Sequence, residues 1–318
     1  MVRKLDVEAL NTDLNSVRSL LARRTVESDP IGHLQFSSRA REIERQLEEL
    51  HETPETKASL AVYFAGGPVQ GSRGIRADFA GEAVSILQDL IAKQFANMEL
   101  GAMAGFGPVP LRGNSDMLIT DLARGSVGVI LEEAESNLSL TQSELSVAVR
   151  KVAEDIQQTS QTDATAFEEL LGQVDTRYFA SLTQIFRLLD ESRATVRLVE
   201  GEQDLELDAQ AVHRGRVRTE SATTSDEDDV RFSGRLFLLP EARKFELRLL
   251  GSEETIHGNV SREFASANLA QVQADNVVNR DWAVAMRVRT ITRPNRPPQF
   301  TYTLTRLVRQ LTRLSPRN

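Results

Sequence analysis

The sequence predicts an α+β protein that begins with a helical hairpin and ends with a small, basic β-barrel. Apolar residues recur at helical spacing through most of residues 6–50, which is typical of amphipathic helices. Apolar and polar residues alternate in several short runs, most clearly within residues 232–304, as they do in half-buried strands. A chain of 318 residues can hold two or three domains, so we expect several units in succession.

Residues 1–56 are predicted to form the helical hairpin. Asp6 is expected to cap a first helix that ends near Arg24, and Asp29-Pro30 then breaks the helical pattern. A second helix follows with a narrow apolar stripe and a highly charged outer side. Two amphipathic helices joined by a short break favour an antiparallel hairpin, and such narrow stripes suit oligomerisation.

Residues 57–135 are predicted to form a small antiparallel layer of order β-β-α-β-β. Alternating apolar residues place a strand at residues 60–64, and a Gly-Gly-Pro turn leads into a short second strand. A helix is expected over about residues 78–95, followed by a strand hairpin over residues 117–133. One helix on an antiparallel sheet is an α+β arrangement.

Residues 136–193 are predicted to form a helical connector. A capping box at residues 141–144 opens its first helix, and Asp175 is expected to cap a later one. Residues 194–229 follow as a hairpin, a helix and an acidic linker. Because the end of this linker is polar and acidic, we interpret residues 221–229 as a mobile loop before the barrel.

Residues 230–318 are predicted to form a basic β-barrel with a C-terminal helix. The expected order is three strands, a helix over residues 262–273 and two strands, which fits an OB-like barrel; an SH3-like barrel fits nearly as well. The C-terminal helix is expected because Arg306, Arg309 and Arg313 recur at helical spacing beside a stripe of leucines.

Charge is divided unevenly along the chain. Residues 231–318 carry 15 basic and 7 acidic side chains, whereas the whole chain has a net charge of −8. Most of these basic residues are arginine, which bonds phosphate bidentately and stacks on nucleobases. The asymmetry predicts an anionic partner, and DNA or RNA is the first candidate. The predicted nucleic-acid-binding residues are Arg287, Arg289, Arg293, Arg296, Arg306, Arg309 and Arg313.

The same basic surplus is also compatible with roles that involve no nucleic acid. The arginines could form the solvated face of a docked helix, or they could pair with the acidic half of the chain or with another subunit. An anionic membrane surface is the weakest of these candidates, because the expected final helix is short and lacks aromatic anchors.

A second and weaker anion site is predicted just before the helix expected at residue 78. Small residues there leave backbone N–H groups free to hold a phosphate, and arginine adds charge. The residues are Gly71, Ser72, Arg73, Gly74 and Arg76. A tight turn requires the same glycines, and the run matches neither a P-loop nor a dinucleotide-binding motif, so a purely structural turn is the favoured interpretation.

The composition excludes several classes of chemistry. The chain has no Cys, which removes thiol catalysis, disulfides and Cys-ligated metal sites. Its 4 His residues are scattered without metal-ligand spacing, so we expect no metal and no cofactor, and we identify no catalytic residue. The chain begins without the apolar core of a signal peptide, and no apolar run approaches the length of a membrane span. We therefore expect no membrane association and a cytoplasmic location.

The leading functional prediction is a non-catalytic, nucleic-acid-associating accessory protein that uses the basic barrel. The alternative is a protein–protein scaffold or regulatory subunit of a bacterial multi-protein complex, in which the hairpin forms a homo-oligomer or binds a partner protein. A phosphate-handling enzyme that uses residues 71–76 is a further alternative, although the absence of a catalytic signature argues against an enzyme.

Overall fold

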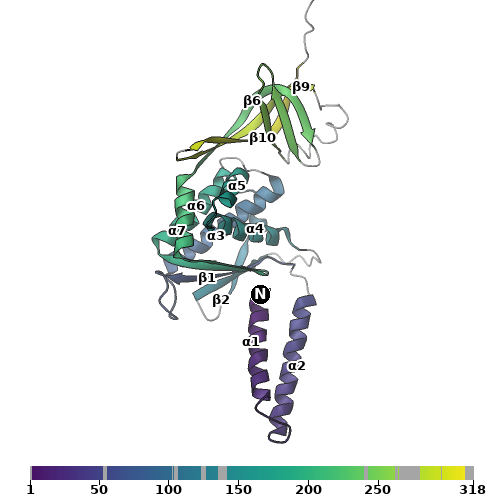
Figure 1. The fold of residues 1–318 in the computed structure, drawn as a ribbon, viewed down its shortest axis with the longest axis vertical. Helices are drawn as coiled ribbons and strands as arrows, with labels where there is room; N and C mark the ends of the chain where they lie inside the picture. Colours follow the sequence, from purple (N-terminus) through teal and green to yellow (C-terminus); the bar gives the residue numbers. More distant parts are fainter. Residues whose placement is uncertain are drawn as a thin grey trace, which may run out of the picture.

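Three parts follow one another along the chain in the computed structural model: a pair of helices, a central α+β unit and a closed barrel (Figure 1). The described residues are 2–52, 56–101, 103, 107–122, 127–134, 142–239, 243–261, 264, 280–294 and 296–311. The mixed α+β class, the N-terminal helical pair and the C-terminal barrel predicted from the sequence are confirmed.

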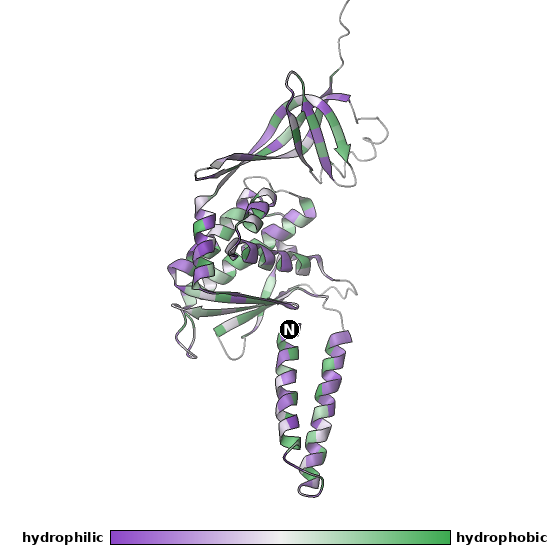
Figure 2. Cartoon of the chain, viewed as in Figure 1, coloured by the Kyte–Doolittle hydropathy of each residue, from purple (hydrophilic) through white to green (hydrophobic). Residues whose placement is uncertain are grey.

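The N-terminal pair consists of α1 (Arg3–Leu21) and α2 (Pro30–Glu52). Their facing stripes bury a small apolar cluster made of Leu14, Val17, Ala40 and Ile43. The outer sides of both helices are largely hydrophilic (Figure 2). Because α1 already begins at Arg3, Asp6 is not its cap and lies in its first turn. A carboxylate there interacts favourably with the positive end of the helix dipole.

The central unit is built on one antiparallel sheet of order β2-β3-β1-β4-β5. Its strands are β1 (Ser59–Gly66), β2 (Met117–Leu122), β3 (Val127–Glu133), β4 (Ala194–Glu200) and β5 (Gln203–Leu207). The two hairpins expected from the sequence therefore join through β1, which pairs with both β3 and β4. The turn expected between β2 and β3, at residues 123–126, lies outside the described residues.

The second strand expected after β1 is absent as a strand from the described chain. Val69 and Ile75 form an isolated bridge in its place. The reason is local, because Gly71 and Gly74 both have positive φ and turn the backbone tightly before it can extend. The bridge leads directly into the helix that follows.

Helices cover one face of the sheet (Figure 1). They are α3 (Ala77–Leu100), α4 (Glu144–Ser160), α5 (Thr165–Gln173), α6 (Thr176–Glu191) and α7 (Ala209–Ser221). A single apolar core joins these helices to the inner face of the sheet, with Tyr178 and Phe186 among its largest fully buried side chains. Segments 57–135, 136–193 and 194–229 thus all contribute to this one core.

Three of the described helices, α4, α6 and α7, begin with a polar side chain that caps the first turn. Ser143 accepts a hydrogen bond from the Ser146 amide at 3.1 Å and caps α4. Asp175 accepts from the Tyr178 amide at 2.7 Å, and Asp208 accepts from the Ala211 amide at 2.7 Å. The cap at Asp175 was predicted correctly from the sequence, whereas α4 begins at Glu144 with Ser143 as its cap, two residues after the start that the capping box predicted.

The outer face of the sheet holds the start of α1. Val2 is fully buried against Ala61, Ile130 and Val199, which alternate with the residues facing the helices. Lys4 adds an ion pair with Asp204 of 3.1 Å. The helical pair is therefore attached to the sheet through its first turn.

The C-terminal part is a closed barrel of order β10-β8-β7-β6-β9. Its strands are β6 (Thr223–Leu239), β7 (Lys244–Leu249), β8 (Thr255–Val260), β9 (Arg280–Arg293) and β10 (Arg296–Gln310). All pairings are antiparallel except that of β8 with β10, which is parallel. Hydropathy alternates along the strands (Figure 2), and the inward set includes Leu236, Phe245, Leu247, Met286 and Leu304.

The acidic run before the barrel is a strand and not the mobile loop predicted from its polarity. β6 begins at Thr223, and its first half pairs in register with the end of β9. Asp226 lies opposite Arg289 in that register, so the carboxylate is balanced across the strands. The polarity of this run suggested a loop because the strand that pairs with it lies more than 50 residues further along the chain, where local sequence patterns cannot reveal it.

The C-terminal helix was also predicted wrongly, since β10 continues as a strand to Gln310. The register of β10 shifts between Leu304 and Arg306 and again between Leu307 and Arg309. Each irregularity displaces the side-chain alternation, so two leucines three apart both reach the barrel interior. This spacing imitates a helix. The helix expected at residues 262–273 lies outside the described residues except for Phe264, which is buried in the barrel core.

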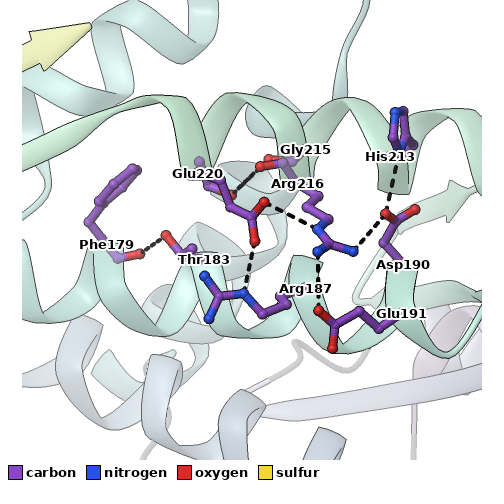
Figure 3. Close-up of polar contacts among 10 residues, drawn as sticks. Phe179, Thr183, Arg187, Asp190, Glu191, His213, Gly215, Arg216 and Glu220 are labelled. Carbon is purple, nitrogen blue, oxygen red and sulfur yellow. Dashed lines mark hydrogen bonds and ion pairs between the residues drawn. The ribbon is translucent and has the colours of Figure 1, made fainter.

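Helix α7 connects the central unit to β6 and is fastened to α6 by a network of ion pairs (Figure 3). Arg216 contacts Asp190 at 3.2 Å and Glu220 at 3.2 Å, and Arg187 contacts Glu220 at 2.8 Å. The hydrogen bond from Arg187 holds the pKa of Glu220 below its usual value. Beside this network the two helices approach closely at Gly215.

We predict that Gly215→Ala destabilises the protein by about 1–3 kcal/mol, because overpacking a tight contact forces neighbouring groups to move. A Cβ at residue 215 would lie 2.2 Å from the buried ring of Phe186. Gly81→Ala is the matched control within helix α3, since its Cβ meets nothing within 4 Å. The control should be neutral or stabilising by up to about 1 kcal/mol. Chemical denaturation measures both, and equal effects would contradict the close contact.

Candidate functional site

The arginines predicted to bind nucleic acid lie largely on β9 and β10, and several form contacts within the protein. Arg289 is only 7% exposed. Its Nε donates to Asp226 Oδ1 at 2.7 Å, and its guanidinium also donates to the backbone oxygen of Val174. Asp226 in turn accepts from Thr176 Oγ1 at 3.0 Å. Arg289 therefore joins β6, β9 and the junction between α5 and α6.

Three further members of the predicted set also form internal ion pairs. Arg287 pairs with Asp228, and Arg306 pairs with Asp229 at 2.7 Å. Arg293 approaches Glu168 of α5 at 3.4 Å. Pairing of the arginines with the chain's own acidic residues was one alternative to nucleic-acid binding, and it is present at these positions.

The remaining members are placed differently. Arg309 is exposed on β10 and forms no ion pair with a described residue. Arg296 begins β10, but its side chain is outside the described part of the structure, as is Arg313 altogether. The predicted set therefore does not form one free basic patch within the described residues.

The second predicted anion site is an exposed turn. The amide of Gln70 donates to the Gly74 oxygen at 2.9 Å, which closes a loop containing Ser72 and Arg73. Arg76 precedes α3 and forms an ion pair with Asp78 in the first helical turn. A carboxylate of the chain itself thus lies at this helix N-terminus, where a bound anion was expected. Anion binding here stays a prediction.

The sequence analysis did not single out the outer face of the barrel formed by β6, β7 and β8. Strand register places Phe237, Glu246 and His257 side by side on this face, with Lys244 and Arg248 on either side of Glu246. The guanidinium of Arg248 lies over the Phe237 ring at 5.0 Å from its centroid. Lys244 forms no ion pair with a described residue and is exposed. The outward-facing polar residues of the alternating strand β7 could have indicated this face from the sequence.

A cavity of about 230 Å³ lies among α3, α4 and the α5–α6 junction. Polar groups on its wall include Asn97, Lys151, Asp155 and Asp175. Asp155 is fully buried, accepts from the Tyr178 hydroxyl at 2.9 Å and pairs with Lys151 Nζ at 2.9 Å. Burial raises the pKa of Asp155 despite both partners. Periodicity cannot reveal such a cavity, because its residues come from separate helices.

No known protein family, curated protein or solved structure matches the chain. The function must therefore be argued from its own residues. Among the described residues, no group of three or more His, Cys, Asp or Glu side chains is arranged to hold a metal ion. Within that same part of the chain, no helix has the length and apolar character needed to cross a bilayer.

We predict that the Asp226–Arg289 pair is strongly coupled, with an interaction free energy of roughly 1–3 kcal/mol in a double-mutant cycle of Asp226→Asn and Arg289→Met. Denaturation of the four proteins measures this. A cycle on the exposed pair of Arg76 and Asp78 is the control and should give a smaller interaction free energy, because solvent screens exposed charges. Equal values in the two cycles would contradict the structural role of Arg289.

The same pair predicts an acid-sensitive contribution to stability. Burial acts to raise the pKa of Asp226, but the hydrogen bond and charge of Arg289 outweigh it, and the pKa is lowered. A lowered folded-state pKa stabilises the protein above the unfolded value of about 3.9, and this stabilisation is lost as pH falls through the folded value. The free energy of unfolding of Asp226→Asn should therefore depend less on pH in this acidic range than that of the wild type.

Proposed function

We propose that this chain is a non-catalytic, nucleic-acid-associating accessory protein whose barrel binds through the outer face of β6, β7 and β8. The observation that carries the proposal is the combination of an arginine stacked on Phe237 and an exposed, unpaired Lys244 among the described residues of that face. Arg243 precedes Lys244, is exposed, and likewise forms no ion pair with a described residue. Lys244 and Arg243 are free to meet phosphates, whereas Arg289 is not, and Arg248 would have to exchange its ion pair with Glu246 (2.9 Å) for a phosphate.

The strand order supports a barrel of the OB type within this proposal. The first strand, β6, pairs with the second and the fourth, and the third pairs in parallel with the fifth. OB barrels bind oligonucleotides on the face of their second and third strands, between the loops that follow the first and fourth. Here those strands are β7 and β8, which carry Lys244, Arg248 and His257 outward.

The chemistry of the face suits a single-stranded or irregular nucleic acid. A partly exposed aromatic ring offers a base a stacking surface, and arginine beside it contributes cation–π attraction and a phosphate contact. Phe237 and Arg248 supply this pair, and His257 lies on the neighbouring strand. The positive charge of residues 231–318 adds long-range attraction.

We predict that Lys244→Glu/Arg248→Glu weakens binding of labelled single-stranded DNA or RNA to the full chain by about tenfold or more. The dependence of log affinity on log salt should become shallower by about one for each phosphate that the variant no longer neutralises. Fluorescence anisotropy over a salt series, with single- and double-stranded DNA and RNA, measures both quantities.

The matched control is Arg23→Glu/Arg41→Glu, which makes the same charge change at two exposed positions of the helical pair. It should change binding only slightly. Loss of binding confined to Arg306→Glu/Arg309→Glu would move the interface to β10. Absence of binding by the wild type at low salt would overturn the proposed function altogether.

A second candidate function, a protein–protein scaffold or regulatory subunit, is favoured by the tip of the helical pair. Val26, Ile31 and Leu34 are exposed there by 62%, 70% and 63%. Exposed apolar residues gathered at one end of an extended element are typical of contact surfaces. In this alternative the hairpin forms a homo-oligomer or holds a partner protein.

We predict for this alternative that Ile31→Lys/Leu34→Lys dissociates an oligomer of the full chain, because each charge would be buried in the contact. Light scattering coupled to size-exclusion chromatography gives the mass. Gln35→Lys, on an exposed position of the same helix, is the control and should leave the mass unchanged. A wild-type monomer across the concentration range would contradict self-association through the tip.

A further inference from the structure

The two edges of the central sheet differ in the side chains that they present. The order β2-β3-β1-β4-β5 leaves β2 and β5 each with one side that pairs with no described strand. Such an edge offers a row of backbone N–H and C=O groups to any extended strand, and native proteins commonly protect it with charged side chains. β5 follows this rule, because its exposed residues are Asp204 and Glu206.

β2 does not follow it. All residues from 118 to 122 are exposed, and Asp121 is the one charged residue of the strand. Leu118, Ile119 and Leu122 are large and apolar, and they are exposed by 53%, 58% and 70%. An edge that is both open and apolar is typical of a strand that pairs with another chain.

A β-bulge in β2 changes which of its side chains share a face. Ile119 lies opposite Leu131 of β3, but the next paired residue is Asp121, which lies opposite Ile130. Thr120 is therefore the extra residue of the bulge. Leu131 belongs to the core beneath the helices, whereas Ile130 belongs to the cluster on the outer face of the sheet.

The bulge gathers the apolar residues. Met117, Ile119 and Leu122 share the face toward the helices, and Leu118 and Asp121 share the outer face. Without the extra residue, strict alternation would place Leu122 on the face opposite to Ile119. The helices cover Leu131 but leave Ile119 and Leu122 exposed, so this apolar row ends in solvent among the described residues.

The charges of the two edges indicate which strand can pair with β2. Pairing of β2 with β5 of another copy would bring Asp121 close to Asp204 and Glu206, and like charges on paired strands are destabilising. That contact would also be heterologous and would leave an open edge at each end of the assembly. Pairing of β2 with β2 is self-complementary and closes at two copies.

The bulge also makes a symmetric pair possible over the whole strand. Residues that lie opposite one another in an antiparallel pair share a face, and six residues in strict alternation cannot meet this condition when the strand pairs end to end with itself. With the bulge, Met117 lies opposite Leu122 of the second copy, and Leu118 lies opposite Asp121. No carboxylate then opposes another, and the two apolar rows become continuous.

We propose that β2 pairs with β2 of a second copy of this chain, antiparallel and about a two-fold axis, and so joins two central sheets into one. The strand supplies 6 residues, whereas a standard interface has about 20–30 on each side. The dissociation constant should therefore be roughly micromolar or weaker. The proposal is independent of nucleic-acid binding, because it involves no residue of the barrel.

Sedimentation velocity of the full chain over a wide concentration range is the first test, and the mass should rise from one chain to two. Ile119→Lys/Leu122→Lys places two charges in the contact and should raise the dissociation constant about tenfold or more. Both positions are exposed in the single chain, so the Tm should change little. The control Ile31→Lys/Leu34→Lys makes the same change at the tip of the helical pair and should leave the dissociation constant unchanged.

Disulfide cross-linking tests the register, because the chain has no Cys of its own. A mixture of the single variants Leu118→Cys and Asp121→Cys should form a mixed disulfide under mild oxidation, since side chains directly opposite in antiparallel strands are close enough for one. The control mixture of Leu118→Cys with Leu122→Cys places the two thiols on opposite faces and should cross-link far less. Intact mass spectrometry identifies the mixed product.

Three results would overturn the proposal. The first is a wild-type chain that stays monomeric at every concentration. The second is dissociation by Ile31→Lys/Leu34→Lys but not by Ile119→Lys/Leu122→Lys, which would place self-association at the tip. The third is equal cross-linking of the two mixtures. Lys244→Glu/Arg248→Glu should dimerise like the wild type, so loss of nucleic-acid binding and loss of the dimer are separate outcomes.

Discussion

The arrangement of this protein depends on one buried charge contact, that of Arg289 with Asp226 and the backbone of Val174. A guanidinium that is almost wholly buried is tolerated only when its hydrogen bonds are satisfied, because removal from water is costly. Here the satisfying groups come from β6 and from the α5–α6 junction. The contact therefore requires that the strands and the helices keep one relative position.

Long strands make this contact possible. β6 and β9 continue beyond the barrel core, and Ile291 of β9 is fully buried in the core of the central unit. Apolar burial thus continues from the central unit into a strand of the barrel, and the ion pair of Arg289 lies two residues away on the same strand. Helix α7 leads into β6 and is itself fastened to α6 by Arg216 and its acidic partners (Figure 3). The junction is held by both apolar packing and charge.

This use of charge changes what the basic C-terminal segment implies. Arg287, Arg289 and Arg306 are matched by the acidic first half of β6, so a surplus counted along the chain overstates the free positive surface. Among the described residues, Arg243, Lys244 and Arg309 are exposed cations without an ion pair, whereas Arg248 lies over Phe237 and pairs with Glu246. The cavity at Asp175 lies apart from the proposed binding face, within the central unit and next to the residues that hold Arg289 and Asp226.

The sequence by itself determined the elements whose signals are local. Helical stripes specified α1 and α2, the cap Asp175 specified the start of α6, and strict alternation specified the inward residues of β7 and β9. Tertiary structure decided the rest. The acidic run lies in a strand because β9 pairs with the backbone of residues 223–227, and because arginines of β9 and β10 pair with Asp226, Asp228 and Asp229. The bulges of β10 give a strand the apolar spacing of a helix. The cavity at Asp175 and the basic face of β7 depend on elements far apart in the sequence, and no local pattern encodes which of them will meet.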